Sequence, residues 1–226
     1  MVRNSIAAAF SLPLLPSLLT YHEWGEPGLW LIVVIAKEAL IGLMIGFISA
    51  IPFQAMESAG VIIDNQRGAS MAMAWNPLSS EQTLPLGSLL NQAGCALFFS
   101  LGYLTVWLGV VYQSYVLWPI TAVFPIFPRD APLQLYLLFS ELLQIAWRLA
   151  APAIITMFLA EFGLGLMNRF VPQMNVFILS MPIKSALAIL VLILSLTLNF
   201  QVFVEQMTQF LRFTPLLQNI LIPQNE

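Results

Sequence analysis

Charge is scarce in this sequence. It has 8 Lys and Arg and 11 Asp and Glu among 226 residues, so charged residues make up only 8%. Soluble domains carry roughly 25% charged residues, because charge is what covers a water-exposed surface. Hydrophobic residues reach 59%, and no charged residue occurs from Gln82 to Pro128. The chain is therefore predicted to be an integral membrane protein.

Other scarcities exclude classes of function. A net charge of −3 leaves no basic patch for a phosphate backbone, so nucleic-acid binding is not expected. The lone Cys95 cannot form an internal disulfide, and the lone His22 cannot build a histidine-based metal site. Residues 22–26 carry only the first half of the HExxH motif of metalloproteases. We expect no enzymatic activity and no cofactor.

The hydrophobic runs indicate an all-α fold. They are continuous stretches of Leu, Ile, Val, Phe and Ala, without the alternation of a membrane β-barrel strand. Residues 5–19, interrupted by Pro13 and Pro16, are predicted to be a broken helix too short to cross lipid. The first crossing helix is predicted over Leu29–Phe53 and continues to Arg67.

Small and charged residues recur on one face of that first helix. Glu38, Gly42, Gly46 and Ala50 repeat every four residues, a pattern that lets another helix approach closely. Asp64 and Arg67 are spaced i, i+3, which predicts an ion pair. The following connection, Gly68–Gly87, is long for a compact protein, and such loops are usually functional or disordered.

Proline and glycine predict the remaining boundaries. Pro85 suits the first position of a helix, and Gly102-Tyr103 predicts a hairpin of two short arms between Leu86 and Trp118. A long helix is expected over Leu133–Phe170, with a kink at Pro152. The prolines up to Pro182 are predicted to separate it from the most lipid-like run, Ile183–Val204, which an amphipathic tail follows.

Three functional hypotheses remain from the residues alone. Charges inside apolar segments, Lys37, Glu38, Glu161 and Lys184, would suit a stand-alone secondary transporter. An intramembrane enzyme would instead depend on one carboxylate such as Asp64 or Glu161. The chain shows no internal repeat and few complete spans, so it is better interpreted as one subunit of a larger membrane assembly.

Two stretches resemble a known family. Ala36–Gln92 contains Glu38, Gly42, Gly46, the run DNQRG at 64–68 and Asn76-Pro77, and Phe158–Ser185 contains GLMNR at 165–169 and Pro172-Gln173. In this order they resemble the FliR family of flagellar export-gate proteins and its injectisome counterparts, the SctT proteins of type III secretion. DNQRGAS and Pro182–Ser185 resemble the injectisome members more than the flagellar ones.

The resemblance implies a place and partners. It implies that residues 1–226 form a single multi-pass domain in the bacterial inner membrane, whose kinked helical hairpins pack into a multi-subunit export-gate ring. The implied partners are the two smaller membrane proteins (SctR/FliP-like and SctS/FliQ-like), the export switch protein (SctU/FlhB-like), the cytoplasmic export ring, membrane lipid and unfolded secreted proteins. Family members usually carry another hydrophobic segment before the stretch matching Arg3–Leu19, and this chain is expected to begin after it.

The resemblance also implies a plug. In the family the loop matching residues 68–86 lies beneath the ring, and here it offers the side chains of Met71, Met73, Trp75, Asn76, Pro77 and Leu78. Flexible thioethers and an indole can seal a pore and still yield to many substrates. The alternative is that these residues pack only against the chain's own helices.

A second set of residues is expected to serve helix packing or buried polar pairing. This set is Glu38, Gly42, Gly46, Asp64, Arg67, Gly68, Glu161, Gly165, Asn168, Arg169 and Lys184.

Overall fold

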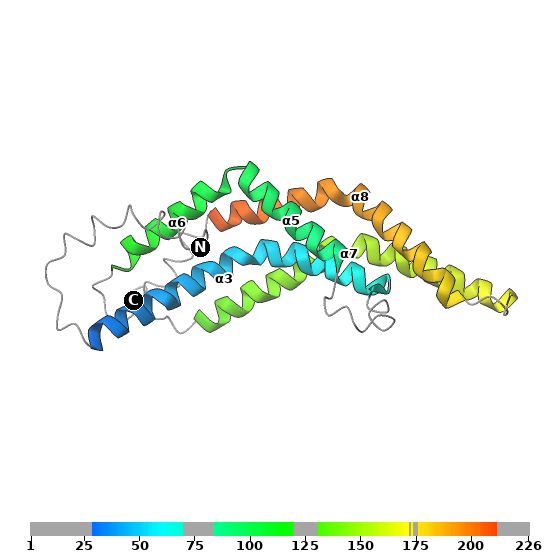
Figure 1. Ribbon diagram of the computed structural model, residues 1–226, viewed down its shortest axis with the longest axis horizontal. Coiled ribbons are helices and arrows are strands. Elements are labelled where there is room, and N and C mark those ends of the chain that lie inside the picture. Colours follow the sequence, from blue (N-terminus) through cyan, green and yellow to red (C-terminus); the bar gives the residue numbers. More distant parts are fainter. Residues whose placement is uncertain (1–28, 70–83, 120–130, 172, 174–175, 212–226) are drawn as a thin grey trace, which may run out of the picture.

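The computed structural model describes residues 29–69, 84–119, 131–171, 173 and 176–211, and the only regular elements in these ranges are helices. The elements are α3 (Leu29–Gln66), α5 (Pro85–Ser100), α6 (Tyr103–Leu117), α7 (Ala131–Phe170) and α8 (Val176–Leu211). Figure 1 shows an elongated molecule with α3 along its middle. The predicted all-α fold is confirmed.

Three of these helices are long and apolar enough to cross a membrane. The candidate spans are Ile32–Gln66, Tyr136–Phe170 and Ile178–Thr208, and the bent pair α5–α6 makes a fourth if it is counted as one span. A span needs about 20 residues to cross about 30 Å of hydrocarbon, so each long helix exceeds what lipid alone requires.

Helix α3 extends almost as far as predicted, to Gln66. The Arg67 N–H donates to the Ile63 carbonyl, and the Gly68 N–H donates to that of Asn65. Gly68 has a φ of +94°, the left-handed conformation in which a helix commonly ends on glycine. The start of the 68–86 loop is therefore a helix cap.

Helices α5 and α6 do not form the predicted hairpin. Pro85 opens α5 as expected, but the axis bends by only 79° between the two helices. Only Leu101 and Gly102 separate them, and the Leu101 and Gly102 N–H groups still donate to the carbonyls of the preceding turn. The chain therefore changes direction without reversing, and α6 extends away from α5 (Figure 1).

Two prolines lie inside long helices. Pro152 is inside α7, which continues on both sides of it. Pro182 is inside α8, which begins at Val176, so the predicted start at Ile183 is wrong. Apolar helices tolerate proline because neighbouring groups can satisfy the freed carbonyls. Helix α8 also continues past Val204 to Leu211, and the rest of the predicted tail lies outside the described residues.

The core lies where α3 packs against α5 and α7, and α7 in turn packs along α8. Phe53 of α3 meets Phe98 of α5 and Phe203 of α8, with ring centroids 5.5 and 5.4 Å apart. Such edge-to-face contacts add to the burial of apolar area. This three-way junction holds the C-terminal part of α5 on the middle of α3.

Candidate functional site

Asp64 is the most deeply buried charge at the end of α3. Its side chain has no exposed surface, and its Oδ1 atom lies 2.7 Å from Arg67 Nη2. Arg67 Nε donates to the same oxygen over 2.8 Å. The predicted i, i+3 ion pair is therefore present and has two contacts.

The second oxygen of Asp64 caps another helix. Asp64 Oδ2 accepts the backbone N–H groups of Leu86 over 2.9 Å and of Gly87 over 3.2 Å. These are the second and third positions of α5, whose N–H groups an N-cap side chain normally satisfies. Leu84 at the N-cap provides no such bond, and proline at the first position has no N–H to donate. A carboxylate there also interacts favourably with the positive end of the helix dipole.

Two glycines bring α3 and α5 into backbone contact at the same place. A Cβ atom on Gly60 would lie 2.5 Å from the Gly87 Cα atom, and one on Gly87 would lie 2.8 Å from Val61 Cγ2. Neither position therefore has room for a side chain. Met181 of α8 completes the site, because its Cε atom lies 3.6 Å from where a Cβ of Gly68 would be.

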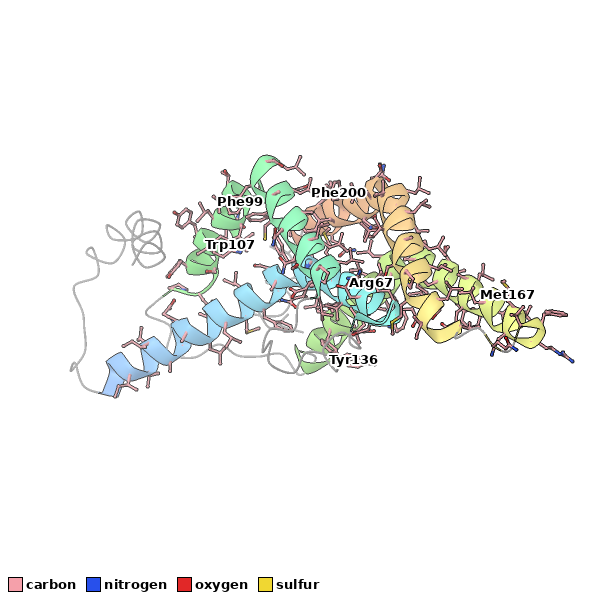
Figure 2. All side chains as sticks on the ribbon, turned by 45° about the vertical axis from the view of Figure 1, so that its right-hand side comes forward. Arg67, Phe99, Trp107, Tyr136, Met167 and Phe200 are labelled. Atoms are coloured by element: carbon pink, nitrogen blue, oxygen red, sulfur yellow. The ribbon has the colours of Figure 1, made fainter. Side chains whose placement is uncertain are left out.

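Both ends of the 68–86 loop therefore meet at one carboxylate, which we call the Asp64 anchor: Asp64, Arg67 and the Leu86 and Gly87 N–H groups. Figure 2 labels Arg67 at this end of α3. The predicted plug residues Met71, Met73, Trp75, Asn76, Pro77 and Leu78 lie outside the described residues. The structure thus describes the two ends of the loop.

The charged pair inside the first span is made by two neighbouring residues of α3. Lys37 is buried, and its Nζ atom lies 3.1 Å from Glu38 Oε1 and donates to the Pro119 carbonyl over 3.0 Å. Glu38 lines a cavity of about 160 Å³ between α3 and α6, together with Ser114 and Tyr115. The pair therefore ties the early part of α3 to the end of α6.

The small-residue stripe of α3 faces hollows. Gly42 lines the cavity next to Glu38, and Gly46 lines a larger one of about 510 Å³ that extends toward Cys95. A Cβ atom on either glycine would meet nothing within 4 Å. The expected close helix packing is therefore not made by the described part of this chain, and it stays a prediction about other subunits.

The remaining predicted residues lie on α7 and α8. Lys184 Nζ is 2.7 Å from Glu161 Oε2, so these two residues of the set form an ion pair between α8 and α7. The C-terminal end of α7, where Figure 2 labels Met167, exposes Gly165, Asn168 and Arg169. Their packing role also stays a prediction.

Sequence reasoning missed the contacts that join different helices. Asn91 of α5 donates to Glu57 of α3, and Trp107 of α6 donates to Ser49 over 2.8 Å. It also missed that Asp64 caps α5, although Leu84-Pro85 was a usable signal. A helix that starts at proline with no Ser, Thr, Asp or Asn before it needs a cap from elsewhere. Among the described residues, no group of three or more His, Cys, Asp or Glu could hold a metal.

The fold and the buried, paired charges define a multi-pass α-helical membrane protein. The family model of bacterial export proteins, family 1, matches residues 1–210. The chain belongs to this family, whose members include the FliR and SctT proteins.

Similar proteins come from both secretion and flagellar systems. Yop proteins translocation protein T of Yersinia pestis is 45% identical over 194 residues, covering 86% of this chain and 74% of that protein. Secretion system apparatus protein SsaT of Salmonella typhimurium is 34% identical, covering 86% and 76%. Flagellar biosynthetic protein FliR of Bacillus subtilis is 30% identical, covering 74% and 64%.

The chain is thus a multi-pass inner-membrane subunit of a bacterial type III export apparatus, and it assembles with other apparatus proteins. The predicted family is confirmed. The secretion relatives are more similar to it than the flagellar ones in these comparisons, as expected from DNQRGAS.

Proposed function

We propose that this subunit forms part of the entrance of the export channel and that its 68–86 loop plugs that entrance when no substrate passes. The observation that carries the proposal is the Asp64 anchor, which holds both ends of the loop at one buried point. A loop fixed at both ends can cover a pore reproducibly, because ordering it costs less entropy than ordering a free segment.

The composition of the loop suits a seal that opens for many substrates. Met71, Met73 and Leu78 are apolar and flexible, and Trp75 adds a large apolar surface. Apolar constrictions block ions by excluding water, and thioethers adapt their shape to whatever passes. Unfolded secreted proteins are the substrates that need such adaptability.

The proposed assembly is a ring with the two smaller gate proteins of the SctR/FliP and SctS/FliQ types, next to a switch protein of the SctU/FlhB type and above the cytoplasmic export ring. The open stripe of α3 at Gly42 and Gly46 offers a place for a neighbouring helix. Large apolar side chains such as Phe158, Phe162 and Ile178 are exposed on α7 and α8, and protein or lipid must cover them.

Deleting Met71–Pro77 tests the plug. The deleted gate is expected to assemble but to leak small ions or molecules, because the seal is gone while the Asp64 anchor remains. Leakage is measured as dissipation of the membrane potential, or as entry of a small dye, in cells that express the whole apparatus. Assembly is checked by native gel electrophoresis of the purified complex.

A matched control shortens another connection by the same length. Ala122–Pro128 lies between α6 and α7, and its deletion is expected to leave the assembled gate tight. A gate that assembles and stays tight without Met71–Pro77 would refute the plug.

A further inference from the structure

We propose that Asp64 is the positioning residue of the plug: it holds the first turn of α5, and with it the C-terminal end of the 68–86 loop, next to the end of α3. This inference rests on the proposed function of the loop. It concerns only described residues, namely Asp64, Arg67, Leu86 and Gly87.

The two oxygens of the carboxylate have separate tasks. Oδ1 binds Arg67, which balances the buried negative charge. Oδ2 binds the Leu86 and Gly87 N–H groups, which follow the loop. An uncapped N–H pair buried in this position would lack a partner, and buried donors without partners favour local unfolding. The Oδ2 contacts are therefore the ones that keep the loop's end in place.

Losing those contacts is expected to free one turn and leave the rest of α5 in place. Further along α5, Asn91 donates to Glu57, and Phe98 packs against Phe53. These contacts do not involve Asp64, and they hold the body of α5 on α3. The first turn is also packed on α3 through the buried Leu86 side chain and the Gly60–Gly87 contact, but its Leu86 and Gly87 N–H groups depend on Asp64, because Leu84 provides no side-chain cap and Pro85 has no N–H.

Asp64 therefore sets the position of the plug more than it sets the fold of the subunit. A freed first turn lets the end of the loop move away from α3, so the plug is displaced from the position in which it closes the pore. Assembly, which depends on the packed helices and their outer faces, remains.

Two double variants differ only in the acceptor at position 64. Asp64→Ala with Arg67→Met removes the carboxylate and leaves no unpaired, partly buried guanidinium, so it avoids a strong cause of misfolding. Asp64→Asn with Arg67→Met is equally neutral but keeps an amide oxygen that can accept the two N–H groups. Comparing them isolates the cap from the charge.

Thiol labelling reports the position of the first turn. In a Cys95→Ala background, Leu86→Cys places a thiol in the first turn, and Leu90→Cys places one a turn further along, at a fully buried position. Each is labelled with N-ethylmaleimide in the assembled complex. The alanine double variant is expected to label about tenfold faster at position 86, with no change at position 90. The asparagine double variant is expected to restore most of the protection.

Cell leakage then tests the role in closure. The alanine double variant is expected to leak as the Met71–Pro77 deletion does, and the asparagine double variant is expected to stay nearly tight. Equal labelling of position 86 in both double variants would overturn the anchoring role, as would exposure of position 90 together with position 86.

The outcomes separate this inference from the proposed function. If the alanine variant frees position 86 while its cells stay tight, and the loop deletion leaks, the positioning role is wrong and the plug stands. If the loop deletion itself is tight, the plug is wrong and the positioning role fails with it.

Discussion

Lys37, Asp64 and Lys184 are the buried charged residues in the described part of the chain, and each lies within 3.1 Å of an opposite charge. A charge buried in an apolar bundle is costly unless it is paired and hydrogen-bonded. The three pairs differ in how far apart their two residues lie along the chain. Asp64–Arg67 and Lys37–Glu38 join near neighbours on α3, whereas Lys184–Glu161 joins α8 to α7.

The Lys184–Glu161 pair predicts an asymmetric effect of mutation. Glu161→Gln leaves a largely buried ammonium without its counter-charge and should lower the free energy of unfolding by about 1 kcal/mol, a value reduced because Glu161 is half-exposed. Lys184→Met removes the buried charge itself and should cost less. Unfolding by SDS in mixed micelles, followed by circular dichroism, measures both. A larger loss for Lys184→Met would contradict this explanation.

At the scale of elements, the α3–α5 crossing is the tightest contact. Gly60 and Gly87 let the two backbones touch, and the Asp64 anchor lies one turn further along α3. In the small-residue stripe of α3, by contrast, a Cβ atom added to Gly42 or Gly46 would meet nothing within 4 Å. Glycines on the same helix therefore have different roles, and their neighbours distinguish them.

Alanine substitution separates these roles. Gly60→Ala should lower the free energy of unfolding by about 3 kcal/mol, because the new Cβ would lie 2.5 Å from backbone atoms that cannot move independently. Gly42→Ala should leave the isolated chain as stable or slightly more so, since alanine favours helix over glycine by about 1 kcal/mol. Micellar unfolding measures the two variants side by side. Equal losses would refute the close crossing.

At the scale of the whole molecule, the outer surface is apolar over much of its length. Phe158, Phe162 and Phe170 of α7 and Ile193 and Leu194 of α8 are each at least 60% exposed. Helices of this length exceed the hydrocarbon thickness, so lipid alone does not account for all of that surface. Neighbouring subunits of the apparatus are the natural cover for the remainder.

Native mass spectrometry tests whether neighbouring subunits bind these apolar surfaces. Tagged chain co-expressed with the two smaller gate proteins and purified in mild detergent is expected to run as one large particle that holds a single copy of this chain. The apolar faces of α7 and the open stripe of α3 then gain partners, which lowers their exposure. Recovery of the chain alone and monodisperse, with both partners expressed, would contradict the proposed ring.

Much of the architecture could be predicted because its causes are local. Scarce charge and continuous apolar runs imply membrane helices, Pro85 opens α5, and Gly68 takes the left-handed conformation that ends α3. The Asp64–Arg67 pair was predictable as well, since both residues lie on one turn of one helix.

The tertiary structure alone decided whatever depends on how helices meet. Whether Gly102 gives a hairpin or a 79° bend is set by the packing of α5 and α6, and whether Pro182 ends a helix depends on what surrounds its freed carbonyl. The capping of α5 by Asp64 joins residues 22 and 23 positions apart, across a crossing that Gly60 and Gly87 allow. Local pattern determines which residues can form a helix, but only the relative placement of two helices determines which buried N–H groups a carboxylate reaches.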